Sequence, residues 1–159
     1  MAAQPYIYEL TMKVRDYECD LQGIVNNANY QHYFEHTRHE FLLTRGVSFS
    51  ELHNQGIDAV VVRLDMAFKS SLRPTEEFIS KLYLKKEGIR YVFYQAIYRL
   101  SDNRLCITAK VDNAILINGK LGYCEALDKI VEECEQKKHN EQMRYDQKGL
   151  PKKLALYRR

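Results

Sequence analysis

The sequence predicts an α+β fold in which an antiparallel sheet wraps around one central helix. Two observations carry this expectation. Residues 30–46 show a single strong helical pattern, and four β-rich segments follow one another between residues 58 and 117. The connections between these segments are short and rich in turn residues, which favours antiparallel neighbours. One apolar helix face and one sheet cover each other best when the helix lies across the sheet.

The N-terminal third is predicted to contain one strand and two helices. Residues 6–14 (YIYELTMKV) are β-branched and aromatic with partial alternation, which is typical of a strand. In residues 30–46, apolar side chains recur at helical spacing and Gly46 stands where a helix would end. Ser48 and Glu51 then have the spacing of a capping box, so residues 48–56 are expected to form a short helix that stops at Gly56.

The rest of the chain is predicted to be mostly strand. The four β-rich segments span residues 58–71, 77–88, 90–102 and 104–117. The turns between them hold glycine, proline, asparagine or aspartate. A final helix is expected from Glu125 to about residue 138, and no firm pattern follows it.

Length and charge describe one domain with a basic tail. A chain of 159 residues suits one domain, which we place at residues 1–138, with a basic extension over residues 139–159. The last 24 residues carry eight Lys or Arg against two acids, whereas the preceding part is mildly acidic. Without a nucleic-acid motif, such a tail indicates a solvated extension rather than a nucleic-acid or membrane ligand. No segment resembles a signal peptide or membrane span, and the four cysteines form no CxxC pair, so we expect reduced thiols and a cytoplasmic protein.

The stretch DLQGIVNNANY, from Asp20 to Tyr30, joins the first strand to the central helix. A turn with an Asx-type helix cap accounts for its aspartate and asparagines on structural grounds alone. The first N–H groups of a helix, however, have no partner within the helix and carry the positive end of its dipole. A carbonyl group placed there would be polarised, and an oxyanion developing on it would be stabilised.

This stretch, together with the order of elements, resembles the hotdog-fold thioesterases of the 4-hydroxybenzoyl-CoA thioesterase family. The residues that match the family's motif are Asp20, Gly23, Ile24, Val25, Ala28, Asn29 and Tyr30, followed on the helix by Glu35 and Arg38. The VNNA of Val25 to Ala28 looks closer to the bacterial long-chain acyl-CoA thioesterase branch. The element order matches over residues 6–135, whereas the specific motif is confined to residues 15–38.

The resemblance implies an active site and its parts. The backbone N–H of Asn27 would be the oxyanion donor, and Asp20 would act as nucleophile or general base. Gly23, Asn26 and Tyr30 would contact the substrate, with Gly23 also allowing a tight turn and close approach of the ligand. Many family members carry histidine where this chain has Asn27, and that side chain is thought to assist catalysis there.

Basic residues at turns are candidates for the phosphates of coenzyme A. Arg73 lies in the turn before residue 77, and Lys86 and Arg90 flank Gly88. Family members often place basic residues at the latter turn, near the partner subunit. Surface charges at hairpin ends are an equally good account of each residue taken singly.

Two other patterns point away from this reading. His32 to His36 fits H-x-x-E-H, the inverted zinc-protease motif, but no third-ligand motif accompanies it. Cys19 lacks a nearby base that would make it a nucleophile, so a small buried side chain is expected.

The sequence therefore predicts an acyl-CoA thioesterase that releases free acid and CoA without a metal or cofactor. Acyl-carrier-protein thioesters are the alternative substrate, and a non-catalytic acyl-CoA-binding module is the alternative of another class. A hotdog dehydratase fits less well, because residues 20–30 contain no histidine to act as its usual base. An uncovered sheet edge and face, and the resemblance, predict a homodimer or homotetramer.

Overall fold

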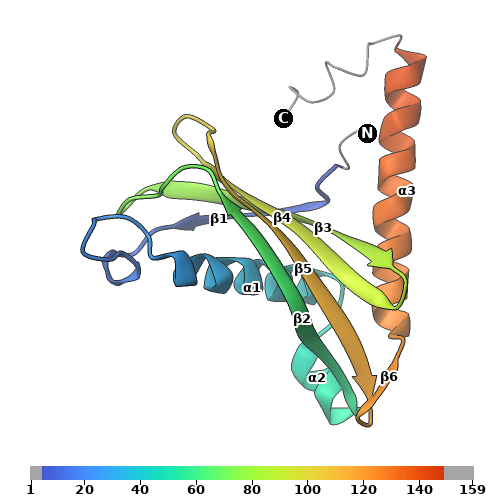
Figure 1. The fold of residues 1–159 in the computed structure, drawn as a ribbon. Helices are drawn as coiled ribbons and strands as arrows, with labels where there is room; N and C mark the ends of the chain where they lie inside the picture. The colour runs from blue at the N-terminus through green and yellow to red at the C-terminus, as the bar shows by residue number, and fades with distance from the viewer. Residues whose placement is uncertain (1–4, 149–159) are drawn as a thin grey trace.

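The computed structural model describes residues 5–148, whose elements follow the predicted order (Figure 1). Strand β1 (Tyr8–Lys13) is followed by a 3-10 turn, η1 (Asp16–Glu18), and by the long helix α1 (Asn27–Thr44). After the short helix α2 (Phe49–Asn54) come β2 (Ile57–Phe68), β3 (Glu77–Glu87), β4 (Arg90–Arg99) and β5 (Leu105–Ile117). A three-residue strand, β6 (Lys120–Gly122), precedes the last helix, α3 (Glu125–Gln147). The turn η1 and strand β6 were not predicted, since each is only three residues long.

The strands form one antiparallel sheet in the order β1-β3-β4-β5-β2, with β6 paired to β5. The three strands in the middle are joined by tight turns, whereas β1 and β2 occupy the two edges. Strand β2 pairs with β5 along its length, from Ile57 opposite Ile117 to Phe68 opposite Ile107. Its other edge has no strand partner within the described part of the chain.

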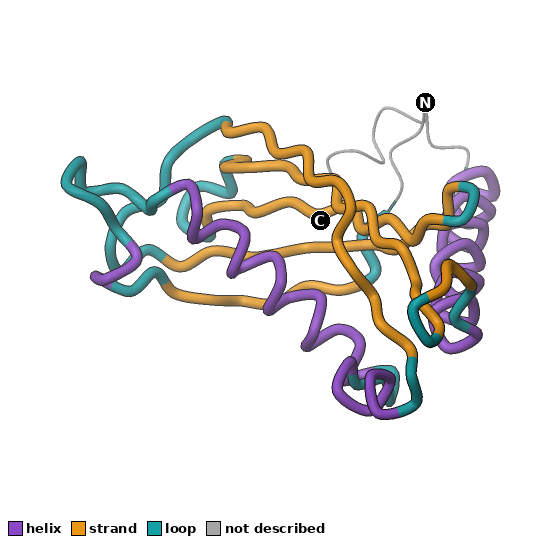
Figure 2. Tube along the Cα trace, turned by 60° about the horizontal axis from the view of Figure 1, so that its bottom comes forward, coloured by secondary structure: helices purple, strands orange, loops and turns teal. Residues whose placement is uncertain are grey.

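Helix α1 lies across one face of this sheet (Figures 1 and 2). Its aromatic stripe is buried as the periodicity predicted, and the ring of Tyr33 packs 4.7 Å from that of Phe78 on β3. Polar ties also fix the helix: the hydroxyl of Thr37 bonds to that of Ser80 over 2.7 Å. The predicted α+β architecture, with an antiparallel sheet around a central helix, is confirmed.

Helix α3 stands at the end of the sheet that carries the β3–β4 turn (Figure 1). Its first half buries Leu127, Ile130, Val131 and Cys134, whereas most of its second half is exposed. The sequence prediction ended this helix near residue 138, and that was wrong. Its later residues are mostly strong helix formers that need no apolar face, and the amide of Gln142 bonds to the carboxylate of Asp146 one turn on.

The predicted domain boundary at residue 138 therefore falls inside α3. The rest of the predicted basic extension, residues 149–159, lies outside the described residues. All four cysteines are free thiols. None of the helices in residues 5–148 combines the length and apolar character needed to cross a bilayer.

Candidate active site

The loop between β1 and α1 is built from two consecutive turns. The first is η1, which Glu18 closes by accepting the backbone N–H of Arg15 over 2.7 Å. In the second, the N–H of Asp20 bonds to the carbonyl of Ile24 and the N–H of Gly23 bonds back to the carbonyl of Asp20, each over 3.0 Å. Gly23 has a φ of +74°, so this turn requires the left-handed conformation that glycine adopts at little cost.

Within the second turn, the Asp20 carboxylate is half-buried and accepts one hydrogen bond. Its Oδ1 receives the backbone N–H of Gln22 over 2.8 Å, which is an Asx-type arrangement. The other carboxylate oxygen has no hydrogen-bond partner among residues 5–148. The structural and catalytic interpretations of Asp20 are thus compatible, because one oxygen shapes the turn and the other is free to act.

Helix α1 begins so that a single N–H is left open. Asn26 is the N-cap: its side chain accepts the N–H of Ala28, and its carbonyl accepts the N–H of Asn29, each over 2.9 Å. The N–H of Asn26 itself bonds to the carbonyl of Glu18 over 3.0 Å. The N–H of Asn27 has no acceptor in the described chain, and this residue is exposed. At the positive end of the helix dipole, that group is a ready hydrogen-bond donor for an anionic oxygen.

Tyr30 lies under the site rather than at its surface. It is 3% exposed, and its hydroxyl accepts the N–H of Leu72 over 3.3 Å. The carbonyl of Leu72 in turn accepts the N–H of Val25 over 2.9 Å. Tyr30 therefore holds the β2–β3 loop against the site loop. The structure gives it a packing role, and its substrate contact stays a prediction.

Of the three basic candidates, the structure brings only Arg73 near the site. Arg73 follows Leu72 in the loop tied to Val25, and its guanidinium forms no ion pair with any described residue. Lys86 and Arg90 lie at the far end of β3 and β4 (Figure 1). Within one chain they do not share a site with Asn27.

Lys86 and Arg90 also have acidic partners of their own. The Nζ atom of Lys86 lies 2.7 Å from Oδ1 of Asp128, and the hydrogen bond to this carboxylate raises the pKa of Lys86. Arg90 lies 3.2 Å from the buried carboxylate of Asp112. A phosphate would have to compete with these acids for either residue.

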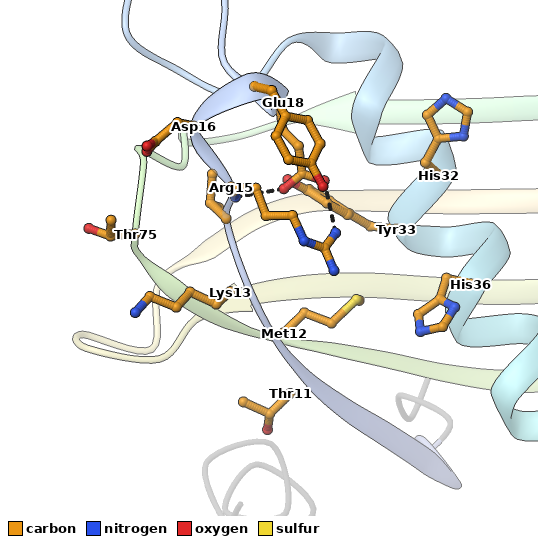
Figure 3. A pocket seen from close by; sticks show the side chains of 12 residues that line it. Thr11, Met12, Lys13, Arg15, Asp16, Glu18, His32, Tyr33, His36 and Thr75 are labelled. Carbon is orange, nitrogen blue, oxygen red and sulfur yellow. Dashed lines mark hydrogen bonds and ion pairs between the residues drawn. The ribbon is translucent and has the colours of Figure 1, made fainter.

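A pocket of about 800 Å³ lies between β1 and α1 (Figure 3). Its walls include Glu18, Tyr33, His32 and His36, but neither Asp20 nor Asn27. Tyr33 is 4% exposed, and burial raises the pKa of its hydroxyl, with the nearby Glu18 carboxylate adding to the effect. The H-x-x-E-H histidines thus line a cavity, although no three His, Cys, Asp or Glu side chains of the described chain are arranged to hold a metal.

Sequence reasoning did not predict that Glu18 and Asn29 help to build the site. The carbonyl of Glu18 accepts both the N–H of Asn26 and the side-chain Nδ2 of Asn29, the latter over 2.6 Å. Asn29 matched the family motif, but the match assigned it no role. The three-residue spacing of Arg15 and Glu18 was the available signal for the closed turn.

The fold is that of the hotdog proteins, and the site loop leads into α1, where the N–H of Asn27 has no acceptor among the described residues. A family model described as "Thioesterase-like superfamily" matches residues 14–137, and the chain belongs to this family. A putative esterase of Aquifex aeolicus is 31% identical over 117 residues, which cover 74% of this chain and 89% of the relative. The chloroplastic acyl-acyl carrier protein thioesterase ATL3 of Arabidopsis thaliana is 36% identical over 104 residues, 65% of this chain. The chain spans just over half, 55%, of that plant relative.

Solved structures share the fold. The crystal structure of a hypothetical protein from Aquifex aeolicus superposes with a TM-score of 0.73 at 25% identity, over 78% of this chain and 98% of that one. A 1,4-dihydroxy-2-naphthoyl-CoA thioesterase from Synechocystis has the same TM-score at 12% identity, over 78% and 94% of the two chains. The likeness at such low identity concerns the fold alone.

Proposed function

We propose that this protein is a thioesterase that hydrolyses acyl-CoA to a free acid and CoA. The observation that carries the proposal is the one unbonded N–H at the start of α1, that of Asn27, with the Asp20 carboxylate in the preceding turn. Such a pairing supplies the two things that thioester hydrolysis needs, a donor for the carbonyl oxygen and a basic or nucleophilic group.

In the reaction, the thioester carbonyl oxygen accepts the Asn27 N–H and becomes the oxyanion of a tetrahedral intermediate. If Asp20 is the general base, it takes a proton from water as the water oxygen attacks the carbonyl carbon. The carbon–sulfur bond then breaks, and the CoA thiolate leaves and is protonated. If Asp20 is the nucleophile, its oxygen bonds to the carbonyl carbon, the carbon–sulfur bond breaks, and CoA leaves as the thiolate and is protonated. Water then hydrolyses the mixed anhydride to the free acid and restores the Asp20 carboxylate.

The choice of CoA as the group that carries the acyl chain rests on Arg73 and on solved proteins of this fold. Arg73 is the candidate cation near the site loop that no described acid neutralises. A Staphylococcus aureus protein of the same fold, with a TM-score of 0.73 at 17% identity, has been solved with CoA. The named activity of the plant relatives favours acyl-carrier-protein thioesters as the second candidate substrate.

We further propose that the protein forms a homodimer through β2, with a pair of dimers as the larger assembly. The free edge of β2 exposes three consecutive valines, Val60, Val61 and Val62, at 37%, 51% and 47%. Long apolar strand edges are normally covered, because their unpaired N–H and C=O groups and apolar side chains invite pairing with another chain. A second copy, paired edge to edge, covers these valines and continues the sheet.

The test of the proposed activity is thiol release from acyl-CoA of several chain lengths and from acyl carrier protein, with Asp20→Asn as the variant. Asparagine keeps the oxygen that accepts the Gln22 N–H, and it caps turns about as well as aspartate. The melting temperature should therefore change little. The loss of the carboxylate should lower kcat by about 10²–10⁴. A wild-type protein that binds acyl-CoA and releases no thiol is a binding module, and normal hydrolysis by Asp20→Asn refutes the role of Asp20.

A further inference from the structure

At the start of α1, most of the backbone N–H groups have hydrogen-bond acceptors in the preceding loop, and one does not. Of the four consecutive backbone donors from Asn26 to Asn29, three have acceptors in the loop, and only that of Asn27 has no acceptor among residues 5–148. The usual helix end leaves several N–H groups free for water. Here the direction of one donor is set by the bonds that its neighbours make.

The carbonyl of Glu18, which lies outside the helix, accepts the hydrogen bonds that hold the start of α1 in place. It receives the backbone N–H of Asn26 over 3.0 Å and Nδ2 of Asn29 over 2.6 Å. These two donors stand on either side of Asn27, so both ends of the peptide segment that carries the open N–H are tied to a single oxygen.

The position of that oxygen is itself fixed by η1. The Glu18 side chain is buried and accepts the N–H of Arg15 over 2.7 Å, and the Arg15 guanidinium lies 3.5 Å from its second oxygen. Figure 3 shows these contacts at the wall of the pocket between β1 and α1. The turn is closed before the helix begins, which makes the Glu18 carbonyl a rigid reference point.

We infer that Asn29 is a positioning residue for the thioesterase reaction, which aims the Asn27 N–H at the substrate oxygen through its bond to Glu18. The inference rests on the proposed function, since it presupposes that Asn27 is the oxyanion donor. Asn29 touches neither the substrate nor the reacting atoms. Its role is to hold a donor in a fixed direction, and a donor displaced by about 1 Å can cost a hundredfold in rate.

The experiment compares the wild type with Asn29→Ala and with the isosteric Asn29→Asp. Both variants remove the Nδ2 donor, and the second also places a carboxylate against the Glu18 carbonyl. The matched control is Gln31→Ala, which removes an exposed amide two residues further along α1 that makes no hydrogen bond in the described chain. We expect kcat to fall by about ten- to hundredfold in both Asn29 variants. KM should stay within about twofold, and the control should keep the wild-type values.

A second measurement distinguishes a misdirected Asn27 N–H from a general loss of structure in the Asn29 variants. A trifluoromethyl ketone analogue of acyl-CoA hydrates to a tetrahedral species that needs the oxyanion donor, whereas a thioether analogue lacks the carbonyl. We expect the Asn29 variants to bind the ketone about tenfold or more weakly and the thioether as the wild type does. An unchanged ratio of the two affinities in a folded variant overturns the inference, as does failure of both variants to fold. A wild-type protein without thiol release refutes the proposed function instead.

Discussion

Replacing Asn27 by proline is a direct way to delete the proposed oxyanion donor while keeping the helix. Proline differs from every other residue in lacking the backbone N–H, and it is favoured at the first helical position, where that group has no helical partner. The residue before it, Asn26, has φ −61° and ψ 135°, which is the extended conformation that a following proline requires. Because the Asn27 N–H bonds to no described group, no hydrogen bond among residues 5–148 is lost.

This substitution should therefore change the free energy of unfolding little and lower kcat strongly. The free energy of unfolding should change by about 1 kcal/mol or less, because a proline compatible with the native backbone mainly reduces the entropy of the unfolded chain. Loss of one oxyanion donor lowers kcat by about 10²–10³, which corresponds to about 3–4 kcal/mol of transition-state stabilisation.

The assay for Asn27→Pro is thiol release under saturating acyl-CoA, together with a urea unfolding curve. Asn27→Ala is measured in parallel, since it removes the side chain and keeps the N–H. The difference between the two variants isolates the contribution of the main-chain donor. If the proline variant is folded and retains more than about a tenth of the rate of the alanine variant, the Asn27 N–H is not the oxyanion donor.

Two further predictions concern the proposed assembly and the pH dependence of stability. Val61→Lys should convert the protein to a monomer in light scattering, because lysine at a strand edge opposes pairing with a second copy. The monomer should still fold, because Val61 is 51% exposed in the single chain; a dimer that persists at micromolar concentration contradicts the edge-to-edge pairing. Burial of Asp128 opposes its ionisation, but hydrogen bonds from Lys86 and Tyr91 outweigh it and lower the pKa of the carboxyl. The stabilisation is thus present above the unfolded-state pKa of about 4 and is lost as pH falls through the lower folded-state pKa. Asp128→Asn should cost about 1–2 kcal/mol at pH 7, and this cost should shrink in urea unfolding below pH 4; a cost that is equal at both pH values would show that the charge contributes nothing.

Local patterns sufficed for most elements of the fold, because each strand and the central helix carry an apolar period of their own. The second half of α3 escaped prediction for the same reason. Its apolar stripe stops at Cys134, and helix propensity alone extends it to Gln147. The sheet order was not predicted, because it pairs β1 with β3 and β2 with β5, which are far apart in sequence.

In the site too, features set by neighbouring residues were predictable, whereas contacts between residues far apart in sequence were not. The turn at Gly23 and the helix start at Asn27 are local, and both stand where the sequence placed them. The partners of Lys86 and Arg90 are 42 and 22 residues away, so no spacing rule could show that these cations are already neutralised. The tie between Glu18 and Asn29 depends on a backbone carbonyl, to which side-chain identity gives no clue.

The arrangement of the two edge strands bears on how the chain folds as it is synthesised. Strands β3, β4 and β5 are neighbours in sequence and can pair as each is completed, and β1 can join once β3 exists. Strand β2 is synthesised before β3, β4 and β5, yet its partner is β5. Residue 57 therefore cannot pair until residue 117 has been synthesised. During that interval the apolar β2 segment has neither its native neighbour nor a second copy to cover it, and such unpaired strands are where nascent chains aggregate. Folding yield should thus depend on how quickly β5 emerges, and β2 is the segment that a chaperone has most reason to hold.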